Sequence, residues 1–147
     1  MGAEPYWYVV KYNPDIEAAL QELREREFRA GRYNPVMPFP PFPVTASSPA
    51  PGAQHSSMEE AMEESDADGT RSILDISRIA DEPDFCVATP LSQERLMELY
   101  GTAQPSRTAV EANMEFFEEV DRGQAIYITL YKNGQPDELM FAGYSFD

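Results

Sequence analysis

The chain has 147 residues, 42% of them hydrophobic and 12% aromatic, which is enough apolar material for the core of one domain. Its 26 acidic and 11 basic residues give a formal net charge of −15, which repels nucleic acids and anionic membranes. The single cysteine excludes an internal disulfide, and no apolar run predicts a membrane span or a signal peptide, so we expect a cytoplasmic protein.

Residues 6–12 predict a first strand, because they are almost entirely aromatic or β-branched. The strand lacks polar alternation, so we expect burial on both faces and a central place in a sheet. A helix should follow, with Asn13 as N-cap, Pro14 in its first turn and an end at Gly31. Glu27 falls on the apolar stripe of this helix. It either lines a cleft as a ligand-binding carboxylate, or it reaches water at the rim of a fraying helix.

The composition changes after this helix, and residues 32–57 become rich in proline, serine and alanine. Residues 35–51 hold 7 of the 13 prolines, which predicts a long Pro-rich loop or insertion with polyproline II character at its start. Phe39 and Phe42 would share one side of such a segment. They would either dock into an aromatic groove of a partner or cover the protein's own core.

Ser57 and Glu60 form a capping box, which predicts a short acidic helix over residues 58–64. The sequence after this helix matches part of a calcium-binding loop. Aligning Gly69 with the invariant glycine of such a loop places the ligands at Glu64, Asp66, Asp68, Thr70, Ser72 and Asp75. The glutamate usual at the last position is missing, so a weak calcium-binding module over residues 64–75 is only an alternative to a solvated acidic helix and turn. No other metal site is predicted.

Residues 72–80 predict a strand, on which Asp75 is the side chain that fits its apolar neighbours least. Asp75 is therefore a second candidate for ligand binding or acid–base chemistry. A short strand is expected over residues 85–88. Cys86 has no histidine or basic residue nearby, so we interpret it as an unreactive buried thiol.

Two further helices are predicted, over residues 92–100 and residues 106–121, and each is preceded by a proline or capped by a serine. The second helix places Glu111 and Glu115 four residues apart, where like charges are mildly destabilising. A helix that tolerates this repulsion gains stability from packing or from a basic partner.

The end of the chain predicts a β-hairpin, the strongest local signal in the sequence. Its arms cover residues 125–132 and residues 139–146, and Asn133 and Gly134 form the turn. Pro136 should limit how far the pairing runs towards that turn, because proline donates no backbone hydrogen bond. Together these elements predict a single α+β domain with a four- to five-stranded, mostly antiparallel sheet and three to four helices.

The charge distribution suggests a function. Residues 1–56 hold 6 acids and 5 bases, a net charge of −1, whereas residues 57–147 hold 20 acids and 6 bases, a net charge of −14. We therefore expect a protein–protein interaction module, similar in its physics to inhibitors and immunity proteins, that presents an acidic face to a basic partner. The residues of this face would be Glu59, Glu60, Glu63, Glu64, Asp66, Asp68, Glu111, Glu115, Glu118 and Glu119.

Catalysis has little support in the sequence. The only histidine, His55, lies in the Pro-rich segment, and no phosphate-binding glycine loop, nucleophile elbow or zinc motif is present. The alternative function is a small-ligand-binding protein or a carboxylate-based enzyme with a cleft near Glu27 and Asp75. No cofactor is predicted.

Overall fold

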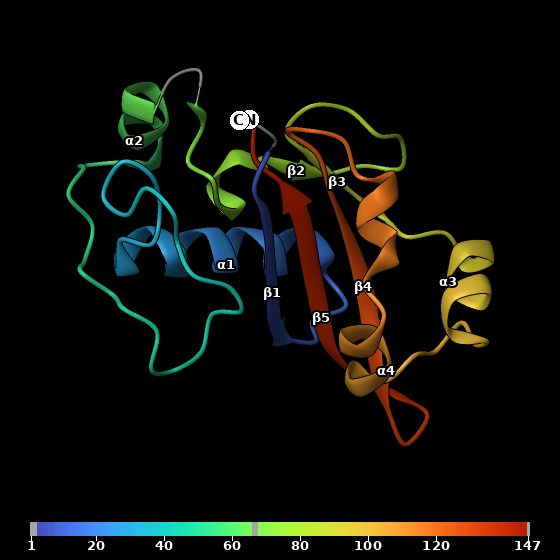
Figure 1. The fold of residues 1–147 in the computed structure, drawn as a ribbon. Coiled ribbons are helices and arrows are strands. Elements are labelled where there is room, and N and C mark those ends of the chain that lie inside the picture. Colours follow the sequence, from blue (N-terminus) through green and yellow to red (C-terminus); the bar gives the residue numbers. More distant parts are fainter. Residues whose placement is uncertain (1–2, 66–67, 147) are drawn as a thin grey trace.

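Five strands form one mixed sheet in the computed structural model, which describes residues 3–65 and 68–146 (Figure 1). In spatial order the strands are β1 (Pro5–Lys11), β5 (Gln135–Tyr144), β4 (Ala125–Lys132), β3 (Val87–Pro90) and β2 (Arg78–Ile79). The β1–β5 and β5–β4 pairs are antiparallel, and the β4–β3 and β3–β2 pairs are parallel. The α+β domain is as predicted, but the expectation of a mostly antiparallel sheet is wrong.

The parallel pairing of β3 with β4 results from the connection between these two strands. Residues 91–124 contain three short helices and carry the chain across one face of the sheet before β4 begins. Such a crossover brings the next strand back in the same direction, whereas a hairpin reverses it. The sequence shows where the helices lie, but it does not show which strands they separate in space.

The predicted hairpin is confirmed, and it forms the centre of the sheet. Asn133 and Gly134 have φ angles of 53° and 75°, the left-handed geometry that a tight hairpin turn requires. The pairing extends from Ala125 opposite Gly143 to Lys132 opposite Gln135, so the second arm begins before Leu139. Pro136 does not stop the pairing before the turn, because it lies opposite Tyr131. The strands show only a register irregularity there, between Leu130 and Tyr131.

β1 is an edge strand, which corrects the prediction of a central one. It pairs only with β5 among the described strands. Its side chains are nevertheless covered on both sides, since Tyr6 and Tyr8 lie in one core cluster while Trp7 and Val9 pack against the other. Lack of alternation reports burial on both faces, and here loops and helices provide that burial instead of a second neighbouring strand.

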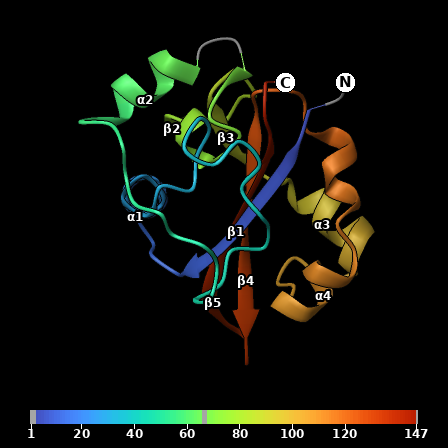
Figure 2. The ribbon, with the colours of Figure 1, turned by 60° about the vertical axis from the view of Figure 1, so that its left-hand side comes forward.

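Helical layers cover both faces of the sheet (Figure 2). One face carries α1 (Ile16–Ala30), α2 (Met58–Ser65) and the 3₁₀ turn η2 (Ile73–Asp75). The other face carries α3 (Gln93–Tyr100), α4 (Arg107–Ala112) and the 3₁₀ helix η3 (Glu115–Glu119). Alternate residues of β4 and β5 enter the two cores, so each face buries its own apolar set. No helix among the described residues is long and apolar enough to cross a membrane.

Two predicted elements are shorter than expected. The strand predicted over residues 72–80 is the turn η2 followed by the two-residue strand β2, because Ser72 caps a tight turn through a bond from the Leu74 amide. The helix predicted over residues 106–121 is interrupted after α4. Asn113 has an extended conformation there, and its side chain accepts a hydrogen bond from the Glu115 amide at 3.1 Å. The break relieves part of the repulsion between like charges along this segment.

Most of the predicted helix ends are confirmed. The Ser57, Ser92 and Ser106 hydroxyls each accept a bond from the backbone amide three residues later. The N-cap of α1 is Asp15 and not Asn13, whose side chain instead accepts from the Asp15 amide at 2.9 Å. Asp15 is preferred because its carboxylate reaches the Ala18 amide at 3.0 Å, in the positive field of the first turn.

The segment of residues 32–57 connects α1 to α2 and is attached to the body of the protein at several points. Gly31 ends α1 with a φ angle of 74°, and the Gly52 amide donates to the carbonyl of Ala30 at 2.9 Å. Phe42 packs against the core beside Tyr8 with a ring distance of 5.1 Å, whereas Phe39 is 65% exposed. Of the two predicted roles for these rings, Phe42 therefore covers the protein's own core.

Candidate functional site

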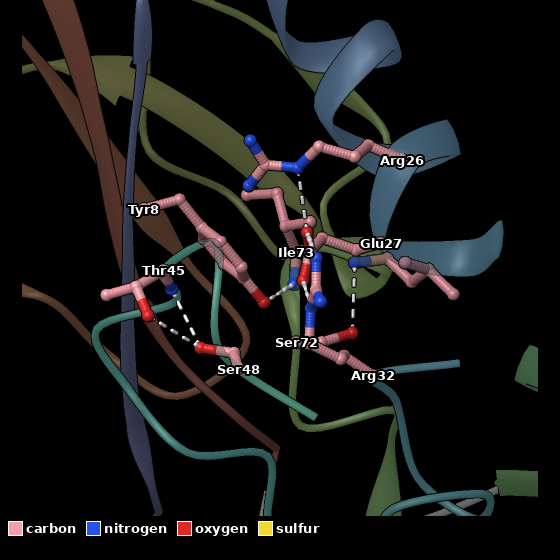
Figure 3. A network of polar contacts seen from close by, with 9 residues as sticks. Tyr8, Arg26, Glu27, Arg32, Thr45, Ser48, Ser72 and Ile73 are labelled. Atoms are coloured by element: carbon pink, nitrogen blue, oxygen red, sulfur yellow. Dashed lines mark hydrogen bonds and ion pairs between the residues drawn. The ribbon is translucent and has the colours of Figure 1, made fainter. Parts of the chain in front are cut away.

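Glu27 is completely buried, and two arginines surround its carboxylate (Figure 3). Arg32 donates from Nε and Nη2 to the two carboxylate oxygens, each at 2.7 Å. Arg26 adds a third bond from its Nε at 2.9 Å. The hydrogen bonds to Glu27 raise the pKa of the Arg32 guanidinium, which therefore stays charged at any physiological pH.

The surroundings of Glu27 match neither of the two interpretations of this residue. Its place on the buried stripe of α1 is real, and the helix does not fray, since α1 continues to Ala30. The carboxylate does not face a cleft, because guanidinium groups occupy both of its oxygens. A buried carboxylate held in this way is a structural ion pair, and the exposed chemistry of the site belongs to the arginines.

A depression of about 370 Å³ lies beside this ion pair. Arg26 and Arg32 form one wall of it, and Val44, Thr45 and Ala46 of the connecting segment form the other. The part of this wall that residues 44–46 form was not predicted, because nothing in the Pro-rich composition indicates that they return to the end of α1.

Asp75 is also buried, at the end of η2. Its Oδ1 accepts bonds from the amide and the hydroxyl of Thr70, both at 2.8 Å, while Oδ2 has no hydrogen-bond partner in the described structure. Burial raises the pKa of this carboxyl, against the opposing effect of the bonds from Thr70. The Tyr6 hydroxyl is a second buried polar atom with no partner among the described residues, and burial raises its pKa as well.

The structure does not bring Glu27 and Asp75 together. No hydrogen bond or ion pair within the described ranges joins them, and each carboxylate has its own set of donors. Neither side chain lines the depression beside Arg26. An acid–base pair requires two carboxyl groups that reach one substrate, and these two carboxyl groups do not form such a pair.

Three of the residues aligned with a calcium-binding loop, Thr70, Ser72 and Asp75, contact one another through Thr70. Thr70 and Ser72 are buried and bond to each other at 2.8 Å, whereas Glu64 is exposed on α2. Asp66 lies outside the described residues, and the remaining ones form no cluster of three acidic, histidine or cysteine side chains that could hold a metal ion. After Gly69 the chain forms a turn and a short strand instead of the second helix of such a site.

His55 has a structural role that its sequence context did not indicate. Its Nδ1 lies 2.8 Å from the hydroxyl of the buried Tyr33, and its Nε2 contacts the carboxylate of Glu64. The imidazole thus links the connecting segment to α2. A histidine in a segment without helix or strand gives no sequence signal for such a contact.

Cys86 is partly buried beside β3, with a φ angle of 65°. Burial raises the pKa of its thiol, and the carboxylates of Asp75 and Asp84 raise it further. The thiol therefore stays protonated at neutral pH, as the lack of basic neighbours in the sequence indicated.

The structure separates the predicted acidic face into two surfaces. Glu59, Glu60, Glu63 and Glu64 project from α2, on the face of the sheet that also carries α1 (Figure 1). The residues predicted farther along the chain lie on the opposite face, and all of them are exposed: Glu111, Glu115, Glu118 and Glu119. The sheet lies between the two groups, so no single flat partner contacts both.

We call the second group, together with α3, the acidic helical layer (residues 91–124). It contains 7 acids and 3 bases, a net charge of −4. Arg95 pairs with Glu98 at 3.2 Å and with Glu119, while Glu115 and Glu118 form no ion pair with any residue in the described ranges. Unpaired carboxylates thus remain at the surface of a layer whose inner side is apolar.

Comparisons of the chain with protein-family models, with curated proteins and with solved structures found no match.

Proposed function

We propose that the protein is an interaction module that binds a basic protein partner through the acidic helical layer. The supporting observation is the arrangement of charge in this layer. Its apolar side chains, among them Val110 and Phe116, are buried against the sheet, and the glutamates of the same segments all face outward. Exposed carboxylates held on packed helices speed the encounter with a basic surface and orient it.

The layer suits a partner better than α2 does. Each surface has two partnered glutamates: Glu64 contacts His55 and Glu60 accepts a bond from the Ser56 hydroxyl at 2.6 Å on α2, whereas Arg107 pairs with Glu111 and Arg95 with Glu119 in the layer. Met97 on α3 is 50% exposed and adds an apolar contact beside the charges. Specific interfaces combine a desolvated apolar centre with a polar rim, and the acidic helical layer provides both.

The proposal is tested with two matched triple variants of the full chain. E111Q/E115Q/E118Q removes three charges from the acidic helical layer, and E59Q/E60Q/E63Q removes three from α2, so both change the net charge from −15 to −12. Each immobilised protein is used to capture proteins from an extract of the source cell at low and moderate salt, and the association rate of a captured basic protein is then measured.

We expect the first variant to bind about tenfold more weakly, because three exposed ion pairs contribute roughly 0.5 kcal/mol each. The second variant should bind as the unchanged protein does. Equal losses in both variants would show that only the net charge matters, and capture of proteins that are not basic, or that stay bound at high salt, would contradict the proposal.

A further inference from the structure

The cluster of Glu27, Arg26 and Arg32 at the end of α1 contains one positive charge more than the carboxylate neutralises. Arg32 alone satisfies both oxygens of Glu27 with a two-pronged contact at 2.7 Å. Arg26 brings a second guanidinium to the same carboxylate. Because arginine stays protonated in proteins, two guanidinium groups and one carboxylate leave a local charge of +1 in a protein whose net charge is −15.

Both arginines line the depression between α1 and residues 44–46, and both have donors that Glu27 does not use. Arg26 bonds to Glu27 only through Nε, so both of its terminal nitrogens have no partner among the described residues. The Nη1 of Arg32 also has no hydrogen-bond partner among the described residues. The Arg32 side chain is 9% exposed and the Arg26 side chain is 46% exposed. One donor group is therefore fixed by burial, and the other can reach into the opening.

The opposite wall is a tight turn whose hydroxyls hold one another in place. The Thr45 amide donates to the Ser48 hydroxyl at 2.7 Å (Figure 3). The Ser47 amide donates to the Thr45 hydroxyl at 3.3 Å. Val44, just before this turn, packs against the core cluster under α1. The hydroxyl of Thr45 is thus carried to the depression by a segment that is fixed at its base.

We propose that this depression binds a small ligand through a phosphate group. The terminal nitrogens of Arg26, the Nη1 of Arg32 and the Thr45 hydroxyl supply donors from two sides, and a tetrahedral anion accepts from several directions at once. The volume of about 370 Å³ accommodates a phosphate monoester of modest size. The site lies on the face opposite to the acidic helical layer, so it does not depend on that layer's proposed role in binding a basic protein.

The test titrates phenyl phosphate and inorganic phosphate into the full chain at 0.15 M salt, where the Debye length of about 8 Å screens the distant acids. Binding is followed by calorimetry and by the NMR shifts of the Thr45 and Ala46 amides. Arg26→Gln should weaken binding at least tenfold. Arg29→Gln is the matched control, because it removes the same charge from the same helix at an exposed position that does not line the depression.

The control variant should bind within twofold of the unchanged protein. Thr45→Val, at an exposed position outside the core, is a second variant that leaves the ion pair intact, and it should weaken binding about threefold, equivalent to one lost hydrogen bond. The proposal is overturned if no saturable binding occurs, if Arg29→Gln weakens binding as much as Arg26→Gln, or if benzoate binds more tightly than phenyl phosphate.

Discussion

The cores on the two faces of the sheet are built from different kinds of side chain. Under α1 and η2 the core contains buried charges and hydroxyls, among them Glu27, Arg32 and Asp75, next to the tyrosines Tyr6 and Tyr8. Under the acidic helical layer the core is almost entirely aliphatic and aromatic, and the charges stay on the outer surface. The first core depends on specific partners, and the second depends on volume and apolar area.

This contrast indicates where sequence changes are tolerated. A buried carboxylate is stable only while each of its donors is present, because an unpaired buried charge costs several kcal/mol. An apolar core tolerates exchange between side chains of similar size and fails mainly when a cavity is made. Substitutions on the two faces should therefore differ in both the size and the origin of their effects.

The largest loss is expected from a cavity in the apolar core. Phe116 is fully buried in the layer above β4, and Phe116→Ala should reduce the free energy of unfolding by about 4 kcal/mol. Phe39→Ala is the control, because that ring is exposed and lies 4.5 Å from the Arg71 guanidinium, so its loss should cost about 0.5 kcal/mol. Urea unfolding measures both, and equal losses would contradict the assignment of Phe116 to a packed core.

The next effect is expected in the polar core. Arg32→Met removes the two-pronged contact and leaves Glu27 with Arg26 alone, which should reduce the free energy of unfolding by about 3 kcal/mol. Arg29→Met breaks the exposed pair with Glu25 on the same helix and should cost less than about 0.5 kcal/mol. A small loss in Arg32→Met would mean that Glu27 is solvated, and the contrast between the two faces would then disappear.

A pair of glycine variants tests how firmly the connecting segment is attached to the polar face. Gly31 and Gly134 have nearly the same φ angles, 74° and 75°. A Cβ on Gly31 would clash with the carbonyl oxygen of Gly52, whereas a Cβ on Gly134 would meet nothing within 4 Å.

Gly134→Ala should therefore cost about 1 kcal/mol, the backbone strain alone. Gly31→Ala should reduce the free energy of unfolding by about 2 kcal/mol or more. In addition to the same backbone strain, its Cβ clashes with Gly52 and displaces residues 52–53. Thermal unfolding compares the two variants, and faster proteolytic cleavage within residues 32–57 in Gly31→Ala would confirm the origin of the difference.

The smallest effect is a dependence on pH that comes from the polar core. Because burial raises the pKa of Asp75 in the folded protein, the fold binds this proton more tightly than the unfolded chain does. The resulting stability is present below the ordinary aspartate pKa of about 4 and is lost as the pH rises through the folded pKa.

Asp75→Asn should remove this part of the dependence of the free energy of unfolding on pH. The stability of the unchanged protein relative to the variant should fall as the pH rises above about 4, measured by urea unfolding at each pH. A relative stability that rises over this range would show that the bonds from Thr70 outweigh burial.

Local signals predicted the elements better than their arrangement. The turn at Asn133 and Gly134, the serine caps and the end of α1 at Gly31 each depend on a few neighbouring residues, and all of them are confirmed. The break of the helix at Asn113 was missed, because it results from a balance between weak propensity and repulsion that tertiary packing decides. The same is true of the turn η2, which replaces most of a predicted strand.

The candidate sites show the same limit. Sequence periodicity placed Glu27 on the buried side of α1, but only the folded chain reveals that Arg32, five residues later, turns back to pair with it. The split of the predicted acidic face into two surfaces could not be predicted either. It depends on which face of the sheet α2 and α4 cover, and charge patterns along the chain carry no information about that choice.

The order of residues alone was sufficient for the serine helix caps, the C-terminal hairpin and the burial of the first strand on both faces, since these depend on interactions over a few residues. Folding of the whole domain was needed to establish the parallel order of β2, β3 and β4, the edge position of β1 and the meeting of Arg26 and Arg32 with Thr45. These features join residues distant in the chain, and their free energies depend on burial that exists only once the complete domain has formed.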